Sequence, residues 1–231
     1  MTIIKDGYLF EVEDNGQRRL RLFAPDLPDA IPYILSNGVS DIALETNDPI
    51  ALYEWYKTRD ESIIYNMRKM DSIDVDILPL ESCKDISALH LAGNVLHSEV
   101  LEGLPALQIL SINNTSNRQK IHIDRLKALR TLWVLKWARN ILGIENTRTL
   151  RELRLWNYCP KSRDLSEINQ LQELADLELI SPRIDSLDGV EQLSSLKRIG
   201  IFYSRTLKDI SALDKCNIEK IEFEHCPKIG R

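Results

Sequence analysis

Residues 168–202 read INQLQELADLELISPRIDSLDGVEQLSSLKRIGIF, and this stretch contains one apolar pattern twice. The apolar positions of the first copy are Ile168, Leu171, Leu174, Leu177 and Leu179, and the second copy has Val190, Leu193, Leu196, Ile199 and Ile201 at the same positions. The last two positions of each copy alternate with outward-pointing residues, which is typical of a short strand buried on one face. The positions before them step by three, which is typical of a 3₁₀ or helical segment that packs one stripe against the strand.

The pattern recurs seven times over the last two thirds of the chain. We call the last-but-one apolar residue of each copy its anchor, and the anchors are Leu89, Leu110, Leu132, Leu153, Leu177, Ile199 and Ile221. Each anchor is followed two places on by another apolar residue. Successive anchors are separated by a nearly constant repeat period of about 22 residues, the length of one solenoid turn made of a strand and a helical return. The sequence therefore predicts stacked parallel strands.

These copies resemble the leucine-rich repeat family, in the 22-residue class found in internalins and phosphatase regulatory subunits. The resemblance implies an α/β solenoid with a parallel concave sheet, a helical or 3₁₀ convex side and an amino-terminal cap. The family usually has Asn five residues after the anchor, where the amide pairs buried backbone groups of the turn. Here these positions are occupied by Asn94, Thr115, Trp137, Tyr158, Pro182, Ser204 and Cys226. We therefore expect irregular turns after the strands in all copies but the first.

We assign residues 1–80 to the cap and residues 80–231 to the repeats, as one continuous solenoid domain. A cap is expected because an open solenoid end exposes apolar core and an unpaired strand edge. Apolar and polar residues alternate on both sides of Asp14-Asn15-Gly16, which predicts a two-stranded hairpin within the cap.

A helix is predicted after the hairpin, within residues 46–60. Asn47 or Asp48 can cap it, and Pro49 suits its first turn. The segments around Ile42 and Ile64 are one repeat period apart and could be two degenerate repeat strands. Their periodicity leaves open whether either segment pairs in the sheet.

The last repeat, around Ile221, is not followed by an amphipathic helix in this sequence. Two expectations remain open for its exposed edge. Either the charges of Lys220, Glu222 and Glu224 protect it, or it pairs with another subunit of an oligomer.

Composition narrows the possible functions. The chain has 231 residues, of which 43% are hydrophobic, so it can bury a core, and its net charge of −5 disfavours a general nucleic-acid binder. No run approaches the roughly 18 apolar residues of a membrane span, and charged residues interrupt the start of the chain, so we expect a cytoplasmic protein. The four cysteines are scattered, which predicts free thiols rather than disulfides or a metal site.

The sequence also predicts which side chains reach the concave face, namely those one before, one after, three after and four after each anchor. Aromatic and charged residues gather there, and such residues are frequent in binding hot spots. The candidate partner-binding residues, including two at the Asn positions of the turns, are Trp133, Lys136, Trp137, Arg154, Trp156, Tyr158, Asp176, Glu178, Arg198, Phe202, Tyr203, Glu222, Glu224 and His225. An alternative for Trp137 and Tyr158 is that they fill turns that lack the Asn.

No catalytic motif accompanies this surface. The chain has no nucleophile elbow, zinc-protease motif or phosphate-binding glycine loop, so no catalytic residue, metal or cofactor is expected. His225 beside Glu222 and Glu224 could hold a cation or act as a base, but an exposed His near carboxylates usually does neither. The pair Asp176 and Glu178 lacks a pocket that would raise one pKa. We therefore predict a non-catalytic protein that binds another protein. Small cytosolic repeat proteins of this kind in bacteria resemble immunity proteins that neutralise toxin domains, and this is the specific role that we predict. The alternative is a scaffold, an adaptor or a homo-oligomeric structural protein.

Overall fold

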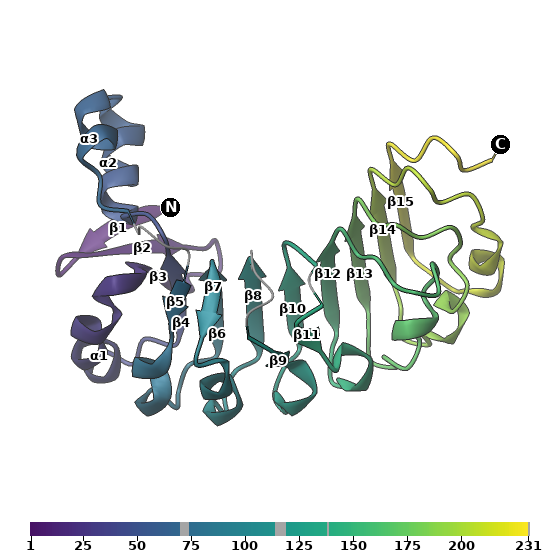
Figure 1. Ribbon diagram of the computed structural model, residues 1–231, viewed down its shortest axis with the longest axis horizontal. Helices are drawn as coiled ribbons and strands as arrows, with labels where there is room; N and C mark the ends of the chain where they lie inside the picture. Colours follow the sequence, from purple (N-terminus) through teal and green to yellow (C-terminus); the bar gives the residue numbers. More distant parts are fainter. Residues whose placement is uncertain (70–73, 114–118, 138, 231) are drawn as a thin grey trace. The chain divides into compact units, whose positions relative to one another are not determined.

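The computed structural model describes residues 1–69, 74–113, 119–137 and 139–230. It contains two compact units, residues 1–119 and residues 120–231. Figure 1 labels their strands and helices. In both units parallel strands alternate with short 3₁₀ segments, so the predicted solenoid fold is confirmed. The turn position Thr115 lies outside the described residues.

The first unit contains a sheet with the strand order β1-β2-β3-β4-β6-β8. Its strands are β1 (Thr2–Lys5), β2 (Tyr8–Val12), β3 (Arg18–Phe23), β4 (Asp41–Glu45), β6 (Ala88–Ala92) and β8 (Ile109–Asn113). The pairs β1-β2 and β2-β3 are antiparallel, and the later pairs are parallel. The predicted hairpin is confirmed as β2 and β3, and with β1 it covers the edge of the parallel strands by backbone pairing.

The repeat period begins earlier in the chain than we expected. Leu20 of β3 lies opposite Ile42 of β4, which in turn lies opposite Leu89 of β6. Leu20 and Ile42 are one repeat period apart and fully buried, so the expected strand around Ile42 is confirmed, and β3 is a further repeat strand. The expected strand around Ile64 is wrong, because that segment forms the helix α3 (Glu61–Asn66).

Capping side chains mark where two helices of the first unit begin. The helices here are α1 (Leu27–Ser36), α2 (Pro49–Thr58) and α3. The predicted helix is confirmed as α2, and Asp48 caps it by accepting the backbone N–H groups of Ile50 and Ala51 at 3.0 and 3.2 Å. Asp60 likewise accepts the backbone N–H of Ser62 at 2.9 Å and starts α3 where we expected a strand. None of the described helices is long and apolar enough to span a membrane.

The second unit contains a fully parallel sheet with the order β10-β12-β13-β14-β15. Its strands are β10 (Thr131–Val134), β12 (Glu152–Trp156), β13 (Asp176–Ile180), β14 (Arg198–Phe202) and β15 (Lys220–Glu224). The anchors lie opposite one another in the order Leu132, Leu153, Leu177, Ile199 and Ile221. Two minor parallel pairs, β5 (Asp74–Asp76) with β7 (Asn94–Leu96) and β9 (Ile121–His122) with β11 (Ile141–Leu142), lie within the first and second unit respectively.

The core lies between the strands and the 3₁₀ segments that return to them. These segments are Ala24–Asp26, Leu78–Ser82, Ser98–Gly103, Ile123–Arg125, Ile144–Asn146, Ser166–Ile168, Val190–Gln192 and Ser211–Lys215. The apolar positions that step by three are buried, as Leu171 and Leu174 show with no exposed surface. Each such leucine stabilises the fold by roughly 1.5–3 kcal/mol relative to leaving it in water.

The turns after β6, β12, β13, β14 and β15 share one backbone feature, so these turns are more regular than we expected. The residue four places after the anchor has a left-handed backbone in Gly93, Asn157, Ser181, Tyr203 and His225. In the first four of these, the N–H donates to the carbonyl that ends the next strand, as from Ser181 to Phe202 at 2.7 Å. After β12, β13 and β14 these bonds between repeats satisfy backbone groups without the family's Asn. After β10 the donor is instead Trp137, five places after its anchor, which bonds Trp156 at 2.9 Å.

Candidate functional site

Outward side chains of the second unit's sheet form three rows that run across the strands. We call this surface, opposite the buried anchors, the open face. Row 1 contains Thr131, Glu152, Asp176, Arg198 and Lys220; row 2 contains Trp133, Arg154, Glu178, Gly200 and Glu222; row 3 contains Trp156, Ile180, Phe202 and Glu224. Because paired strands are about 4.8 Å apart, the side chains of a row are direct neighbours.

Contacts within the open face hold the half-buried Trp133 in place. Its indole Nε1 donates a hydrogen bond to Glu152 Oε1 at 2.8 Å. The guanidinium of Arg154 lies 5.1 Å from the centre of the Trp133 ring, which is a cation–π contact. Arg154 Nε also lies 3.0 Å from Glu178 Oε1. Trp133 and Arg154 therefore each make two contacts within the open face.

Ion pairs also connect neighbouring positions in row 1 and at the end of the sheet. Arg198 Nε donates to Asp176 Oδ2 at 2.8 Å, and this hydrogen bond raises the pKa of Arg198. Lys220 Nζ lies 2.9 Å from Glu222 Oε1. Such exposed pairs contribute only about 0–1 kcal/mol each to stability, but they fix where the charges lie on the open face.

Row 3 is the apolar part of the open face. The Trp156 side chain is 38% exposed, and Ile180 and Phe202 follow it as half-buried neighbours on β13 and β14. The Phe202 ring lies over Gly200, where an added Cβ atom would come within 2.7 Å of Phe202 Cε2. Gly200 thus makes room for the ring, and row 3 extends towards row 2.

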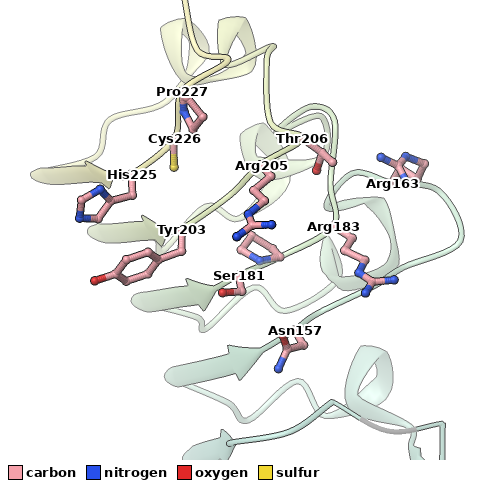
Figure 2. Close-up of a pocket in the computed structure, with 11 residues that line it drawn as sticks. Asn157, Arg163, Ser181, Arg183, Tyr203, Arg205, Thr206, His225, Cys226 and Pro227 are labelled. Atoms are coloured by element: carbon pink, nitrogen blue, oxygen red, sulfur yellow. The ribbon is translucent and has the colours of Figure 1, made fainter.

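A cavity of about 910 Å³ lies beyond the carboxyl ends of β12 to β15 (Figure 2). Its walls include Tyr203 and His225, whose left-handed backbones follow directly after the strands. Their rings stack with centres 4.8 Å apart and an angle of 20°. Arg183 and Arg205 line the same cavity, and our sequence analysis did not predict either of them. We call this cavity the arginine pocket.

Comparisons with known proteins agree with this geometry. No family model matches the sequence, and no curated protein sequence matches it. Among solved structures, internalin C2 of Listeria monocytogenes superposes with a TM-score of 0.54 at 17% identity, over 86% of this chain and 82% of that one. This chain has the leucine-rich repeat fold.

Two further solved structures resemble the chain less closely. Internalin F of Listeria monocytogenes gives a TM-score of 0.49 at 17% identity, over 75% of this chain and 54% of that one. A leucine-rich repeat protein of Leptospira interrogans gives 0.47 at 17% identity, over 92% of this chain and 57% of that one. The chain thus spans about half the length of these two proteins. The fold assignment rests on internalin C2, and the roles of residues in these proteins do not carry over at such identities.

Two of the predicted contact residues, Trp137 and Tyr158, pack against each other in the turns after β10 and β12. Tyr158 has only 1% of its surface exposed and packs edge-on against the half-buried Trp137, with ring centres 5.1 Å apart. Tyr158 is therefore inside the turn, as the alternative expectation had it, and we exclude it from the candidate surface. Lys136 remains exposed beside this turn.

The Tyr158 hydroxyl has no hydrogen-bond partner among the described residues. Burial is the main cause that raises the pKa of this hydroxyl, and the negative charges of Glu167, Asp164 and Glu145 raise it further. The neutral phenol is thus the form that the folded protein holds.

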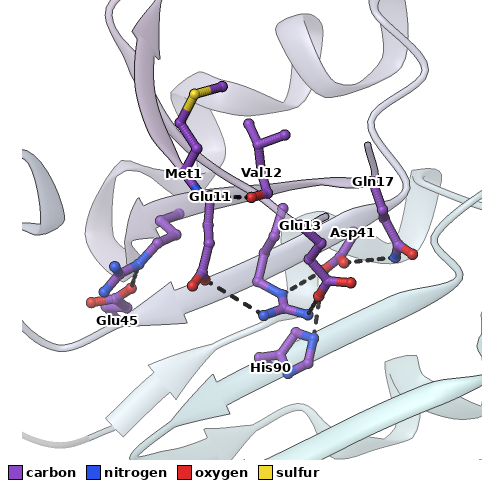
Figure 3. A network of polar contacts seen from close by, with 10 residues as sticks. Met1, Glu11, Val12, Glu13, Gln17, Asp41, Glu45 and His90 are labelled. Atoms are coloured by element: carbon purple, nitrogen blue, oxygen red, sulfur yellow. Dashed lines mark hydrogen bonds and ion pairs between the residues drawn. The ribbon is translucent and has the colours of Figure 1, made fainter. Parts of the chain in front are cut away.

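A second polar cluster, which we call the Arg19 cluster, lies on the sheet of the first unit. Figure 3 labels its members Gln17, Asp41 and His90. Arg19 Nε donates to Asp41 Oδ1 at 2.9 Å, and Gln17 Nε2 donates to the other oxygen of Asp41 at 2.9 Å. His90 Nε2 lies 3.5 Å from Asp41, which is only 2% exposed. Burial opposes the ionisation of Asp41, but hydrogen bonds from His90 and Arg19 outweigh it and lower its pKa. Arg19 and Asp41 are one repeat period apart, a signal that our sequence analysis overlooked.

The carboxylates and the histidine of the open face that we considered for acid–base chemistry contact other charged side chains. Asp176 pairs with Arg198 and Glu178 with Arg154, while His225 lies 3.3 Å from Glu224. Within the described ranges, no group of three or more His, Cys, Asp or Glu side chains could hold a metal ion. All four cysteines are free, and only Cys83 is buried.

Proposed function

We propose that this leucine-rich repeat protein binds a protein partner on the open face of its second unit. Row 3 carries the proposal, because it leaves Trp156 38% exposed beside Ile180 and Phe202. An indole can bury about 150–250 Å², so leaving it in solvent forgoes stabilisation that folding could use. Trp, Tyr and Arg are also the residue types that contribute most to binding at protein interfaces.

The ordered charges around row 3 support the same proposal. Arg154 is held between Trp133 and Glu178, and Arg198 is held by Asp176. Side chains that are already fixed lose little conformational freedom on binding, which favours affinity. A polar border of fixed charges around an apolar centre also selects one orientation of the partner.

The finer form of the proposal is an inhibitor of the immunity type, which neutralises a toxin domain by covering its active surface. No catalytic step is needed for this effect, since occupancy of the partner's surface is sufficient. Interfaces that bury about 1,600 Å² in total are of the size found between enzymes and their protein inhibitors.

A second candidate is a scaffold or homo-oligomer that assembles through β15. Ile221 of this strand is 44% exposed, although it occupies the anchor position that is buried in the other repeats of the second unit. The pair Lys220 and Glu222 lies on the same strand. For this candidate we expect a doubled mass in solution by light scattering, and a return to the monomer when both charges are reversed.

Affinity purification with mass spectrometry from the source organism tests the primary proposal. We expect Trp156→Ala to raise the Kd for a purified partner at least about 30-fold, which corresponds to a hot spot of about 2 kcal/mol. Tyr65→Ala is the matched control, because Tyr65 is an aromatic residue of α3 with 89% exposure and lies in the first unit. Partner affinity that is unchanged in both Trp156→Ala and Phe202→Ala would overturn the proposal.

A further inference from the structure

The arginine pocket contains two guanidinium groups with no counter-charge among the described residues. Arg183 and Arg205 are one repeat period apart, each six places after its anchor, so they occupy equivalent positions in neighbouring repeats (Figure 2). Both residues are exposed and line the cavity of about 910 Å³. Neither side chain makes an ion pair or hydrogen bond with another described residue.

Several other arginines of the second unit pair with carboxylates. Arg163, on the same pocket wall, donates to both oxygens of Asp185 at 2.7 Å, while Arg154 and Arg198 pair with carboxylates of the open face. Arg183 and Arg205 lie in the turns that follow β13 and β14, so equivalent positions of neighbouring repeats bring two like charges to the lining of one cavity. A negatively charged ligand would supply the counter-charges that the described residues do not.

The remaining charges near the pocket do not neutralise these two groups. Asp185 is already engaged by Arg163, and its ionised form is also favoured by Lys208 and Lys228 nearby. The pocket is thus locally basic within a chain whose net charge is −5. Positive potential in one cavity of an acidic protein is suited to select an anionic group.

We propose that the arginine pocket binds two carboxylates of an acidic segment in the protein partner, one at Arg183 and one at Arg205. The inference rests on the proposed function, because Tyr203 of the pocket directly follows Phe202 of row 3 and makes the two surfaces continuous. The bidentate pair of Arg163 with Asp185 shows the geometry that a carboxylate adopts on this wall.

A protein carboxylate fits better here than the backbone of a nucleic acid. Among the described residues that line the pocket, two guanidinium groups are uncompensated, which matches two single negative charges. Glu222 and Glu224 lie on the adjoining end of the open face and would repel the continuous negative charge of a phosphate backbone more strongly than two carboxylates placed at the arginines.

Fluorescein-labelled hexaglutamate, titrated by anisotropy at about 20 mM salt, tests the pocket without the partner. We expect Arg183→Gln combined with Arg205→Gln to weaken hexaglutamate binding at least tenfold. Arg183→Lys combined with Arg205→Lys should weaken it less, because lysine keeps the charge but loses the planar fork. Arg148→Gln combined with Lys215→Gln is the matched control. It removes the same charge from exposed positions of the second unit outside the arginine pocket, and we expect less than a twofold effect.

The outcomes separate this inference from the proposed function. The carboxylate assignment is wrong if hexaglutamate does not bind, or if the Arg183/Arg205 Gln variant and the Arg148/Lys215 control variant weaken its binding equally. It is also wrong if oligothymidine of equal charge binds more tightly through the same arginines. In each of these cases Trp156→Ala can still abolish the partner complex. If hexaglutamate binding depends on the two arginines but Trp156→Ala leaves the partner complex intact, the open-face proposal fails and the pocket remains a carboxylate site. Support for both requires that the arginine variant weakens the partner complex as well.

Discussion

Leu153→Ala measures how much one stacked anchor contributes to the fold. Leu153 is fully buried and lies between Leu132 and Leu177 in register. The substitution removes three carbon atoms, and at about 0.8 kcal/mol for each the lost transfer free energy is about 2.4 kcal/mol. The cavity left between two stacked neighbours adds to this, so we expect the free energy of unfolding to fall by about 3–5 kcal/mol.

Ile221→Ala is the matched control, because Ile221 occupies the same repeat position but is 44% exposed and lies opposite Ile199 on one side. Less area returns to water and no closed cavity forms, so we expect a loss of about 1 kcal/mol. Urea unfolding followed by tryptophan fluorescence reports mainly on the second unit, which contains Trp133, Trp137 and Trp156. With a slope of about 2 kcal/mol/M, Leu153→Ala lowers the midpoint by about 1.5 M or more. Equal losses in the two variants would refute the stacking of the anchors.

Three other substitutions test separate features. Tyr158→Phe removes a buried hydroxyl that has no partner among the described residues, and we expect chemical unfolding to show a gain of about 1 kcal/mol; a loss would show that the hydroxyl is satisfied. Gly200→Ala forces the Phe202 ring to move, and we expect a loss of roughly 1–2 kcal/mol in the same assay together with a changed near-ultraviolet circular dichroism spectrum; an unchanged spectrum would contradict the packing. The lowered pKa of Asp41 means that its ionised form stabilises the fold fully above about pH 4, and that this stabilisation is lost as the pH falls through the lowered pKa. Unfolding measured from about pH 2 to 6 should therefore depend less steeply on pH in Asp41→Asn, and an unchanged slope would contradict the role of the Arg19 cluster.

The strands of the second unit could be predicted to within a residue because the sheet is in register. When each anchor lies opposite the next, the distance between anchors in the sequence equals one turn of the solenoid. The same logic was available for Leu20 and Ile42, which are one repeat period apart. We extended the period to Ile42 but matched it with Ile64 instead of Leu20, whereas α2 and α3 lie in the interval between Ile42 and Leu89.

The open face could be predicted from the alternation of strand residues, whereas the arginine pocket could not. The pocket depends on left-handed backbones at positions such as Tyr203 and His225, which are residue types that rarely adopt this conformation. The inward direction of Tyr158 depends on the same turns. A useful signal was nonetheless present, since Arg183 and Arg205 recur at the repeat period outside the positions that we considered.

When repeats stack in register, the contribution of a position to stability recurs in every copy. Positions that forgo this stabilisation, here Arg183, Arg205 and Trp156, are therefore candidates for a functional role. A leucine repeated at the anchors adds burial in every copy, and a carboxylate opposite a guanidinium, as for Asp176 and Arg198, adds attraction between copies. Repetition of Arg183 as Arg205 instead leaves two guanidinium groups without a carboxylate partner among the described residues, and the exposed Trp156 in row 3 forgoes burial. Folding alone explains neither choice, because uncharged polar residues at these positions would leave the core unchanged. Both exceptions lie on adjoining surfaces of the second unit, so a partner that is apolar at its centre and acidic at one end would compensate for both.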